Sequence, residues 1–190
     1  MSAAETLEEE HKLILRMLKA LSALQPRIEK GKIDPDTLTS VVDFFRTYAD
    51  RFHHAKEEAQ FFPMLEKRGV KPKGCPIGVL HNEHEQGRIL ISALNDAIQK
   101  SKQGDAAANA AAASYIKNAI DFYNDHIWKE DYLLFPMAEK LLSESEQQEL
   151  SAQFAKHEAT IGTDVHHGFE QLAGRILEMI CGEATTCHAA

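Results

Sequence analysis

Residues 53–67 of the chain read HHAKEEAQFFPMLEK, and residues 126–140 read HIWKEDYLLFPMAEK. Each copy opens with a histidine, places a glutamate four residues later and continues to Phe-Pro-Met. The shift along the chain that carries Pro63 onto Pro136 aligns the two copies, and we call this shift the repeat offset. Because an internal repeat usually repeats one supersecondary unit, we predict two related helical hairpins that pack face to face.

Helical periodicity runs through the first half of the chain. Apolar residues from Leu7 to Leu24 recur at steps of three and four, which is typical of an amphipathic helix, here ending before Gly31. Asp34 and Pro35 together form a helix start signal. The helix that they open should run through the first copy of the repeat and bend near its proline.

The second half follows the same plan. Pro76 is placed to start a third helix, and the turn at Gly104 precedes an alanine-rich fourth helix that reaches toward Lys140. Ser143 and Glu146 stand at capping-box spacing and should start a further helical stretch. Almost nothing in the sequence alternates with the period of two that half-buried strands require.

These patterns predict an all-α fold, a four-helix up-down-up-down bundle with an additional C-terminal helical segment. The bundle should occupy residues 1–142, and the helical extension should occupy residues 143–180 and pack on the bundle within the same domain. Residues 181–190 should form a tail. A chain of 190 residues is long enough for one domain with a single sizeable core.

The composition narrows the range of partners. The formal net charge of −8 disfavours nucleic acids and anionic membranes, since both require a basic face. No apolar run approaches the roughly 20 residues of a membrane span. The acidic start MSAAETLEEEHK lacks the blocks of a signal peptide, so we expect a cytoplasmic protein. Cys181 and Cys187 form a small redox pair, a weak metal clip together with His188, or part of a frayed tail.

The repeat offset selects among the ten histidines. His53 with Glu57, and His126 with Glu130, occupy matching positions, and residues four apart lie on one face of a helix. His54 is also followed by a glutamate four residues later, but it has no histidine at its matching position. We therefore expect His54 to be structural or exposed.

The same offset carries His11 onto His84 in the other two predicted helices. Four imidazoles and two carboxylates would then meet inside the bundle, an inventory that suits divalent transition metals, iron above all, better than calcium or magnesium. Glutamates from facing helices can bridge two ions roughly 3.5–4 Å apart. We predict a metal site made by six side chains, which are His11, His53, Glu57, His84, His126 and Glu130.

Four motifs, EEEHK, HHAKEEAQFFP, NEHEQGR and HIWKEDYLLFP, resemble as a set those of the hemerythrin-like (HHE cation-binding) domain in its bacterial form. The resemblance covers about Leu7 to Lys140. It implies that the four predicted histidines are terminal iron ligands and that the two glutamates are bridging carboxylates. Oxygen-carrying hemerythrins have a fifth histidine and use H-x-x-x-x-D in the last motif. Here that motif is H-x-x-x-E, which argues against reversible O2 carriage, and His81 is a candidate for the fifth histidine although the carriers use another spacing.

Two pairs of residues near the predicted ligands have more than one possible role. Asp50 and Tyr123 occupy matching positions three residues before a ligand histidine, and they are candidates for orienting imidazoles. Arg88 and Lys129 are either gates for ligand access or ordinary solvated residues.

The prediction is a non-haem di-iron protein with two iron ions that are bridged by carboxylates and by an oxo or hydroxo group. It would bind a small diatomic or peroxide ligand (O2, NO or peroxide) for sensing, scavenging or storage. The alternatives are a di-iron enzyme that turns over peroxide or NO, an iron storage or delivery protein, and a helical interaction module without metal.

Overall fold

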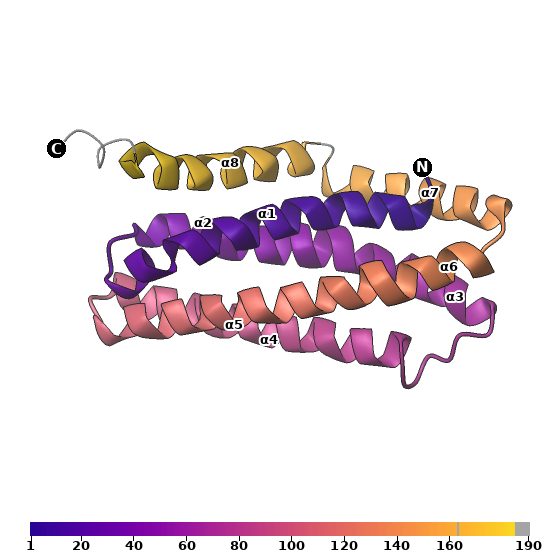
Figure 1. Cartoon of the computed structure of the whole chain (residues 1–190), viewed down its shortest axis with the longest axis horizontal. Coiled ribbons are helices and arrows are strands. Elements are labelled where there is room, and N and C mark those ends of the chain that lie inside the picture. Colours follow the sequence, from indigo (N-terminus) through magenta and orange to yellow (C-terminus); the bar gives the residue numbers. More distant parts are fainter. Residues whose placement is uncertain (163, 185–190) are drawn as a thin grey trace.

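A computed structural model of the chain describes residues 1–162 and 164–184, and every regular element in this part is a helix. The prediction of an all-α fold is confirmed. Within the described residues no helix combines the length and the apolar character needed to cross a bilayer. In chain order (Figure 1) the elements are α1 (Ala3–Glu29), α2 (Pro35–Asp43), η1 (Phe44–His54), η2 (Glu57–Phe61), α3 (Phe62–Lys67), α4 (Ile77–Lys102), α5 (Ala107–Lys129), η3 (Glu130–Leu134), α6 (Phe135–Leu141), α7 (Glu144–Ile161) and α8 (Val165–Ala184).

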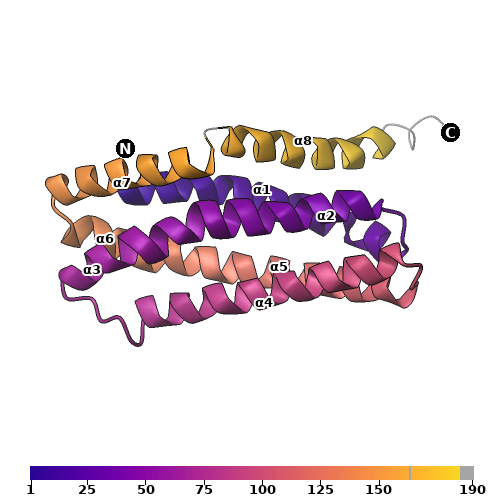
Figure 2. The same cartoon turned by 180° about the vertical axis from the view of Figure 1, so that it is seen from behind.

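Four antiparallel columns form the bundle (Figures 1 and 2). The first column is α1, the second is the helical run from α2 to α3, the third is α4, and the fourth is the run from α5 to α6. α5 packs against both α4 and α1, and α2 packs against α4. The second column begins where the sequence predicts, because the side chain of Asp34 accepts a hydrogen bond from the backbone N–H of Asp36.

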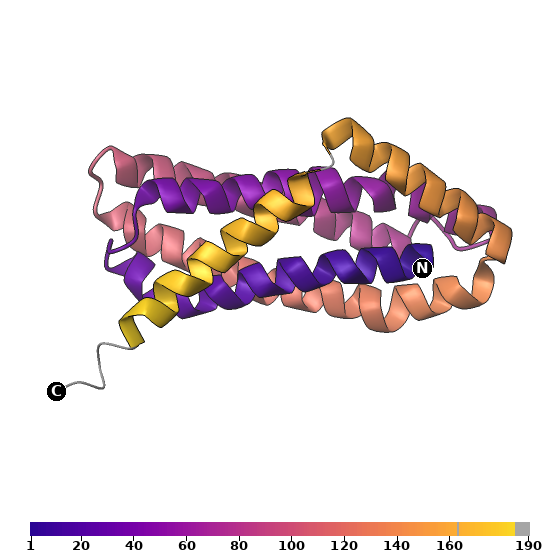
Figure 3. The ribbon, with the colours of Figure 1, turned by 90° about the horizontal axis from the view of Figure 1, so that it is seen from above.

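The two last helices form a layer outside the bundle. α7 packs against α1, η1 and η2, and α8 crosses α1 and η1 obliquely (Figure 3). The division of the chain at residue 143 stays a prediction. α8 runs to Ala184, and the rest of the predicted tail, including Cys187, lies outside the described residues.

A buried polar layer separates two apolar clusters along the bundle. On α1, Leu7 belongs to one apolar cluster and Leu13 to the other, while the buried polar residues Glu10 and His11 lie between them. Buried polar side chains are rare in protein cores unless they are paired or bind a metal. This buried polar layer is therefore the candidate functional site.

The Phe-Pro-Met motif produces the same helix irregularity in both halves. A proline has no N–H to donate and its ring crowds the carbonyl four residues earlier, so the preceding turn widens to π geometry. The backbone N–H of Phe62 donates to the carbonyl of Glu57, five residues back, and Phe135 does the same to Glu130. Pro63 does not end the second column; instead, each repeated proline opens a π turn at a predicted ligand.

The predicted capping box of α7 is present and carries an ion pair. The Ser143 side chain accepts from the N–H of Glu146, and Arg68 from the end of the second column donates to both Glu146 carboxylate oxygens, at 2.7 and 2.5 Å. Hydrogen bonds from Arg68, followed by those from Ser143, lower the pKa of Glu146 to about 2. The pair joins α7 to the bundle.

This pair should make the stability gained from Glu146 depend on pH. The folded-state pKa lies below the ordinary value, so the stabilisation is present above about pH 4.5 and is lost as the pH falls toward 2. We expect Glu146→Gln, which keeps a capping-box side chain, to lower the free energy of unfolding at pH 7 and to have a smaller effect at pH 3. Urea unfolding at both pH values measures this. Glu144→Gln, in the same helical turn, is the control, and an effect of Glu146→Gln that does not change with pH would contradict the prediction.

Candidate metal centre

The structure brings all six predicted ligand side chains together in the buried polar layer. None of them is more than 1% exposed. They come from all four columns of the bundle: His11 from α1, His53 and Glu57 from the second column, His84 from α4, and His126 and Glu130 from the fourth.

The first cluster consists of His11, His53, Glu57 and Glu130, each of which offers a ligand atom within 4.8 Å of the others. The Nε2 atoms of His11 and His53 lie 2.9 Å apart. Nε2 of His11 is 3.2 Å from a Glu130 oxygen, and Nε2 of His53 is 3.7 Å from a Glu57 oxygen. Two imidazoles and two carboxylates thus face one point.

The second cluster consists of His54, His84 and His126, whose ligand atoms also lie within 4.8 Å of one another. The carboxylates of the first cluster reach it as well. Glu57 lies 3.5 Å from Nε2 of His84, and Glu130 lies 3.3 Å from Nε2 of His126. Each glutamate therefore stands between the two clusters, as a bridging carboxylate must.

An outer set of carboxylates orients the histidines of the two repeats. Nδ1 of His53 donates to Glu10 at 2.9 Å, and Nδ1 of His126 donates to Glu83, also at 2.9 Å. Glu10 and Glu83 are themselves related by the repeat offset. The hydrogen bond fixes the ring, because an imidazole that donates from Nδ1 keeps the lone pair of Nε2 for a metal.

The remaining two ligand histidines are each oriented by a carboxylate from the other half of the repeat. Nδ1 of His11 donates to Asp131, and Nδ1 of His84 donates to Glu58, both at 2.6 Å. The repeat offset also carries Glu58 onto Asp131. The four outer carboxylates thus form two pairs related by the repeat offset. The sequence contains this relation, but it does not show which histidine each carboxylate contacts.

The inner polar atoms fit a metal because they face one another without forming hydrogen bonds. Both oxygens of Glu57 and of Glu130, and Nε2 of His84 and of His126, are buried without a hydrogen bond among the described residues. An unpaired buried polar group costs about 1–3 kcal/mol, so such a concentration of them calls for a ligand. Divalent cations that accept mixed imidazole and carboxylate ligands supply the missing contacts.

Burial tunes the pKa values of the same groups. Burial first, and the neighbouring Glu130 next, raise the pKa of Glu57 well above its usual range. Burial lowers the pKa of His53 well below 6.5, which keeps its imidazole neutral, the form that binds metals. Burial acts to raise the pKa of Glu130 too, but His126, His11 and His84 hold it well below its usual range. An ionised Glu130 opposes the ionisation of Glu57, and a bound cation would relieve that opposition.

His54 joins the centre against the sequence-based expectation. It is 2% exposed, its ring stacks on that of His84 with centroids 4.0 Å apart, and its Nδ1 is buried without a hydrogen bond. Its matching position in the other half holds Ile127, so the repeat gave no signal for it. Adjacent residues of an α-helix point in different directions, but a π turn rotates the chain less per residue. η1 ends at His54, and the adjacent residues His53 and His54 are both buried.

The other sequence candidates lie outside both clusters. His81 is partly exposed and contacts the edge of Phe62, with its ring centroid 6.4 Å from that of His84. Asp50 pairs with Arg88 at 2.8 Å and lies 3.7 Å from Nδ1 of His54. The imidazoles of His11, His53, His84 and His126 are thus oriented by the four outer carboxylates, whereas Asp50 faces His54.

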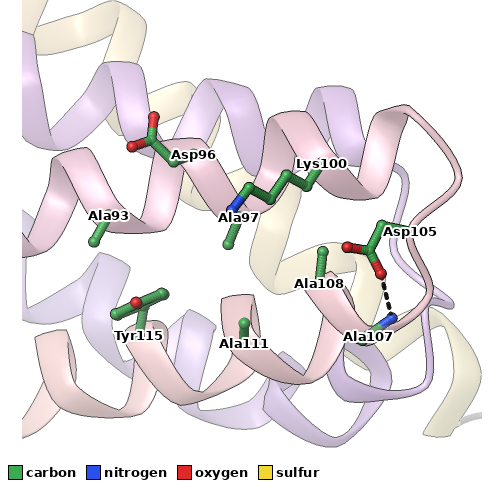
Figure 4. Close-up of a pocket in the computed structure, with 9 residues that line it drawn as sticks. All are labelled: Ala93, Asp96, Ala97, Lys100, Asp105, Ala107, Ala108, Ala111 and Tyr115. Carbon is green, nitrogen blue, oxygen red and sulfur yellow. Dashed lines mark hydrogen bonds between the residues drawn. The ribbon is translucent and has the colours of Figure 1, made fainter.

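A hollow at the other end of α4 and α5 holds none of these groups. It has a volume of about 360 Å³ and is lined mostly by alanines, with Tyr115 and three charged residues (Figure 4). One of those charged residues, Asp105, accepts from the N–H of Ala107 at the start of α5. The hollow is therefore a gap left by small side chains and not a second candidate centre.

Comparisons with known proteins place this arrangement in a family. The model of the hemerythrin HHE cation binding domain matches residues 2–138. An uncharacterized protein of Mycobacterium tuberculosis is 26% identical over 158 residues, which is 83% of this chain and 61% of the relative, so the chain spans less than two thirds of that protein. The iron-sulfur cluster repair protein YtfE of Salmonella newport is 31% identical over 88 residues, 45% of this chain and 40% of YtfE. No solved structure matches the chain significantly.

Proposed function

This chain belongs to the hemerythrin HHE cation-binding domain family, and we propose that it is a non-haem di-iron protein that binds O2, NO or peroxide. Metal binding follows from the family together with the buried histidine and glutamate clusters. The number of ions, their identity as iron and the small ligand are the content of the proposal. Sensing, scavenging or storage of the ligand is the role that we favour.

The observation that carries the proposal is the position of the two inner glutamates. Each lies between imidazoles of both clusters, and their four carboxylate oxygens have no hydrogen-bond partner among the described residues. A carboxylate that serves one ion needs ligands on one side only. Carboxylates with imidazoles on both sides suit two neighbouring ions, as in dinuclear centres.

The protein groups around the centre hold it and exclude water. The four outer carboxylates keep each Nε2 lone pair directed inward, and the apolar side chains of Phe61 and Phe135 are fully buried next to the layer. When bound, an iron pair would supply redox electrons and a coordination position for a small ligand. The seven imidazole and carboxylate groups would leave little room for a larger one.

Iron delivery is a second candidate, favoured by the partial likeness to a protein named for iron-sulfur cluster repair. The burial of every candidate ligand counts against rapid release of metal. Chelator challenge separates the two: retention of iron for hours supports a ligand-binding centre, and loss within minutes supports delivery.

Metal analysis combined with optical spectra tests the proposal directly. We expect two iron ions per chain after anaerobic loading with Fe(II), and an oxo-bridged di-iron absorption band after exposure to air or peroxide. A band that disappears on removal of O2 would mean carriage, and a band that persists would mean oxidation. Protein that binds no iron, and whose melting temperature does not rise on addition of Fe(II), would overturn the proposal.

A further inference from the structure

The buried centre needs a route for a small ligand, and the outer helices pack against one side of the bundle. Lys56 on the α7 side is completely buried, and its Nζ donates to Glu10 and to Glu158 of α7. On α8, Nδ1 of His166 lies 2.7 Å from the hydroxyl of Tyr48. A hollow on this side is lined by Glu10, Glu158 and His166, but by none of the side chains of the two clusters.

A cavity reaches the centre from the opposite side of the second column. It has a volume of about 140 Å³ and lies between η1, α4 and α5. A water molecule in the liquid occupies about 30 Å³, so the cavity holds roughly four or five waters. This space admits a diatomic molecule or a peroxide. The lining residues are Phe45, Arg46, Asp50, His54, Arg88, Ile91 and Tyr123.

His54 connects this cavity to the second cluster. It lines the cavity together with Asp50, which lies 3.7 Å from its Nδ1, and its ring stacks on His84. Because that Nδ1 is buried without a hydrogen bond, a polar guest molecule on this cavity wall would satisfy it. The cavity thus ends at a side chain that belongs to the candidate metal centre.

Charged side chains line one part of the cavity wall. Arg88 is paired with three carboxylates, those of Asp50, Glu58 and Glu85. Of these only Asp50 lines the cavity, together with Arg88 and Arg46, so the wall carries two guanidinium groups and one carboxylate. Such a wall sets no barrier of negative charge against a neutral molecule or a small anion.

We propose that this cavity is the access route for a small ligand to the metal centre, with Ile91 as its apolar wall and the exposed Arg46 at its mouth. The proposal rests on the proposed function in that the centre must bind such a ligand. It adds the path and the residues that line it, which follow from this chain's own structure.

Kinetics of nitric oxide binding to the reduced, iron-loaded protein test the route. Ile91→Phe fills the cavity from the 3% exposed Ile91, whereas Ile89→Phe adds the same bulk on α4 at a side chain that is 69% exposed. A blocked route slows association and dissociation together and leaves Kd unchanged. We expect both rate constants to fall about tenfold in Ile91→Phe and to stay unchanged in Ile89→Phe. Arg46→Trp, which narrows the mouth without altering the core, should act in the same direction.

Four outcomes would decide against the route or against its premise. Unchanged association rates in both Ile91→Phe and Arg46→Trp would overturn the route, and so would a rise in Kd through dissociation alone. Failure of the unmodified protein to bind nitric oxide would count against the proposed function instead. In that case, hydrogen–deuterium exchange at the imidazole C2 position of the metal-free protein still tests the cavity: exchange at His54 should slow in Ile91→Phe, and no slowing would overturn the route.

Discussion

Replacing Lys56 by alanine should cost about 3–5 kcal/mol of folding free energy, because it leaves a buried carboxylate without its cation. The Lys56 ammonium group is completely buried, contacts Glu10 and Glu158, and lies 4.3 Å from the centre of the Phe52 ring. Even with Lys56 present, burial raises the pKa of Glu10 to about 7. Urea unfolding of the metal-free variant measures this cost. We expect the slope of the unfolding free energy against urea concentration to stay unchanged.

The repeat provides a matched control for this prediction. Lys129 occupies the position that matches Lys56 and donates to Glu83 as Lys56 does to Glu10, but its side chain is 29% exposed. Solvent replaces an exposed partner, so Lys129→Ala should cost about 1 kcal/mol or less. Equal costs for the two variants would show that burial under α7 is not the cause. Adding Glu10→Gln to Lys56→Ala should recover part of the loss, because it removes the uncompensated charge.

Glu57→Met should change the stability of the protein in opposite directions with and without metal. In the metal-free protein both Glu57 oxygens are buried and unpartnered, so an apolar side chain of similar length should raise the free energy of unfolding by about 1–3 kcal/mol. In the loaded protein the same change removes a ligand. Loss of an outer partner alone costs about 10–100-fold in metal affinity, so this variant should lose at least about 100-fold.

The two halves of this prediction are measured separately. Urea unfolding in the presence of a chelator gives the metal-free stability, and a competition titration with a coloured chelator gives the metal affinity. Glu66→Met, in the same column but outside both clusters, is the control. Destabilisation of the metal-free protein by Glu57→Met would contradict the interpretation of its oxygens as groups held ready for a metal.

Apolar periodicity and the internal repeat were sufficient to predict most of the helices and their pairing. Apolar spacing along α1, the N-cap at Asp34 and the capping box at Ser143 all lie where local chemistry puts them. These signals are local, because a helix is stabilised by contacts between residues three or four apart. The position of α7 and α8 on α1 and η1 depended instead on long-range packing, which periodicity does not encode.

The repeat offset determined more of the candidate centre than the histidine motifs alone did. It selected His11, His53, His84 and His126 with their two glutamates, and it also matched the outer carboxylates, because a pseudo-twofold axis makes equal positions meet equal surroundings. The differences between the two halves could not be predicted from the offset. Ile127 stands opposite His54, and no second copy of α7 covers Lys129 among the described helices.

The sequence by itself thus determined an all-helical chain with six matched side chains that have metal-binding chemistry. Only the tertiary structure showed that His54 lies beside them and that Lys56 is buried while Lys129 is partly exposed. It also showed a small cavity lined by His54 and Arg88. The physical reason is the same in each case. A π turn, a covering helix and a cavity arise from how whole helices pack, and spacing along one helix contains no information about the helix that faces it.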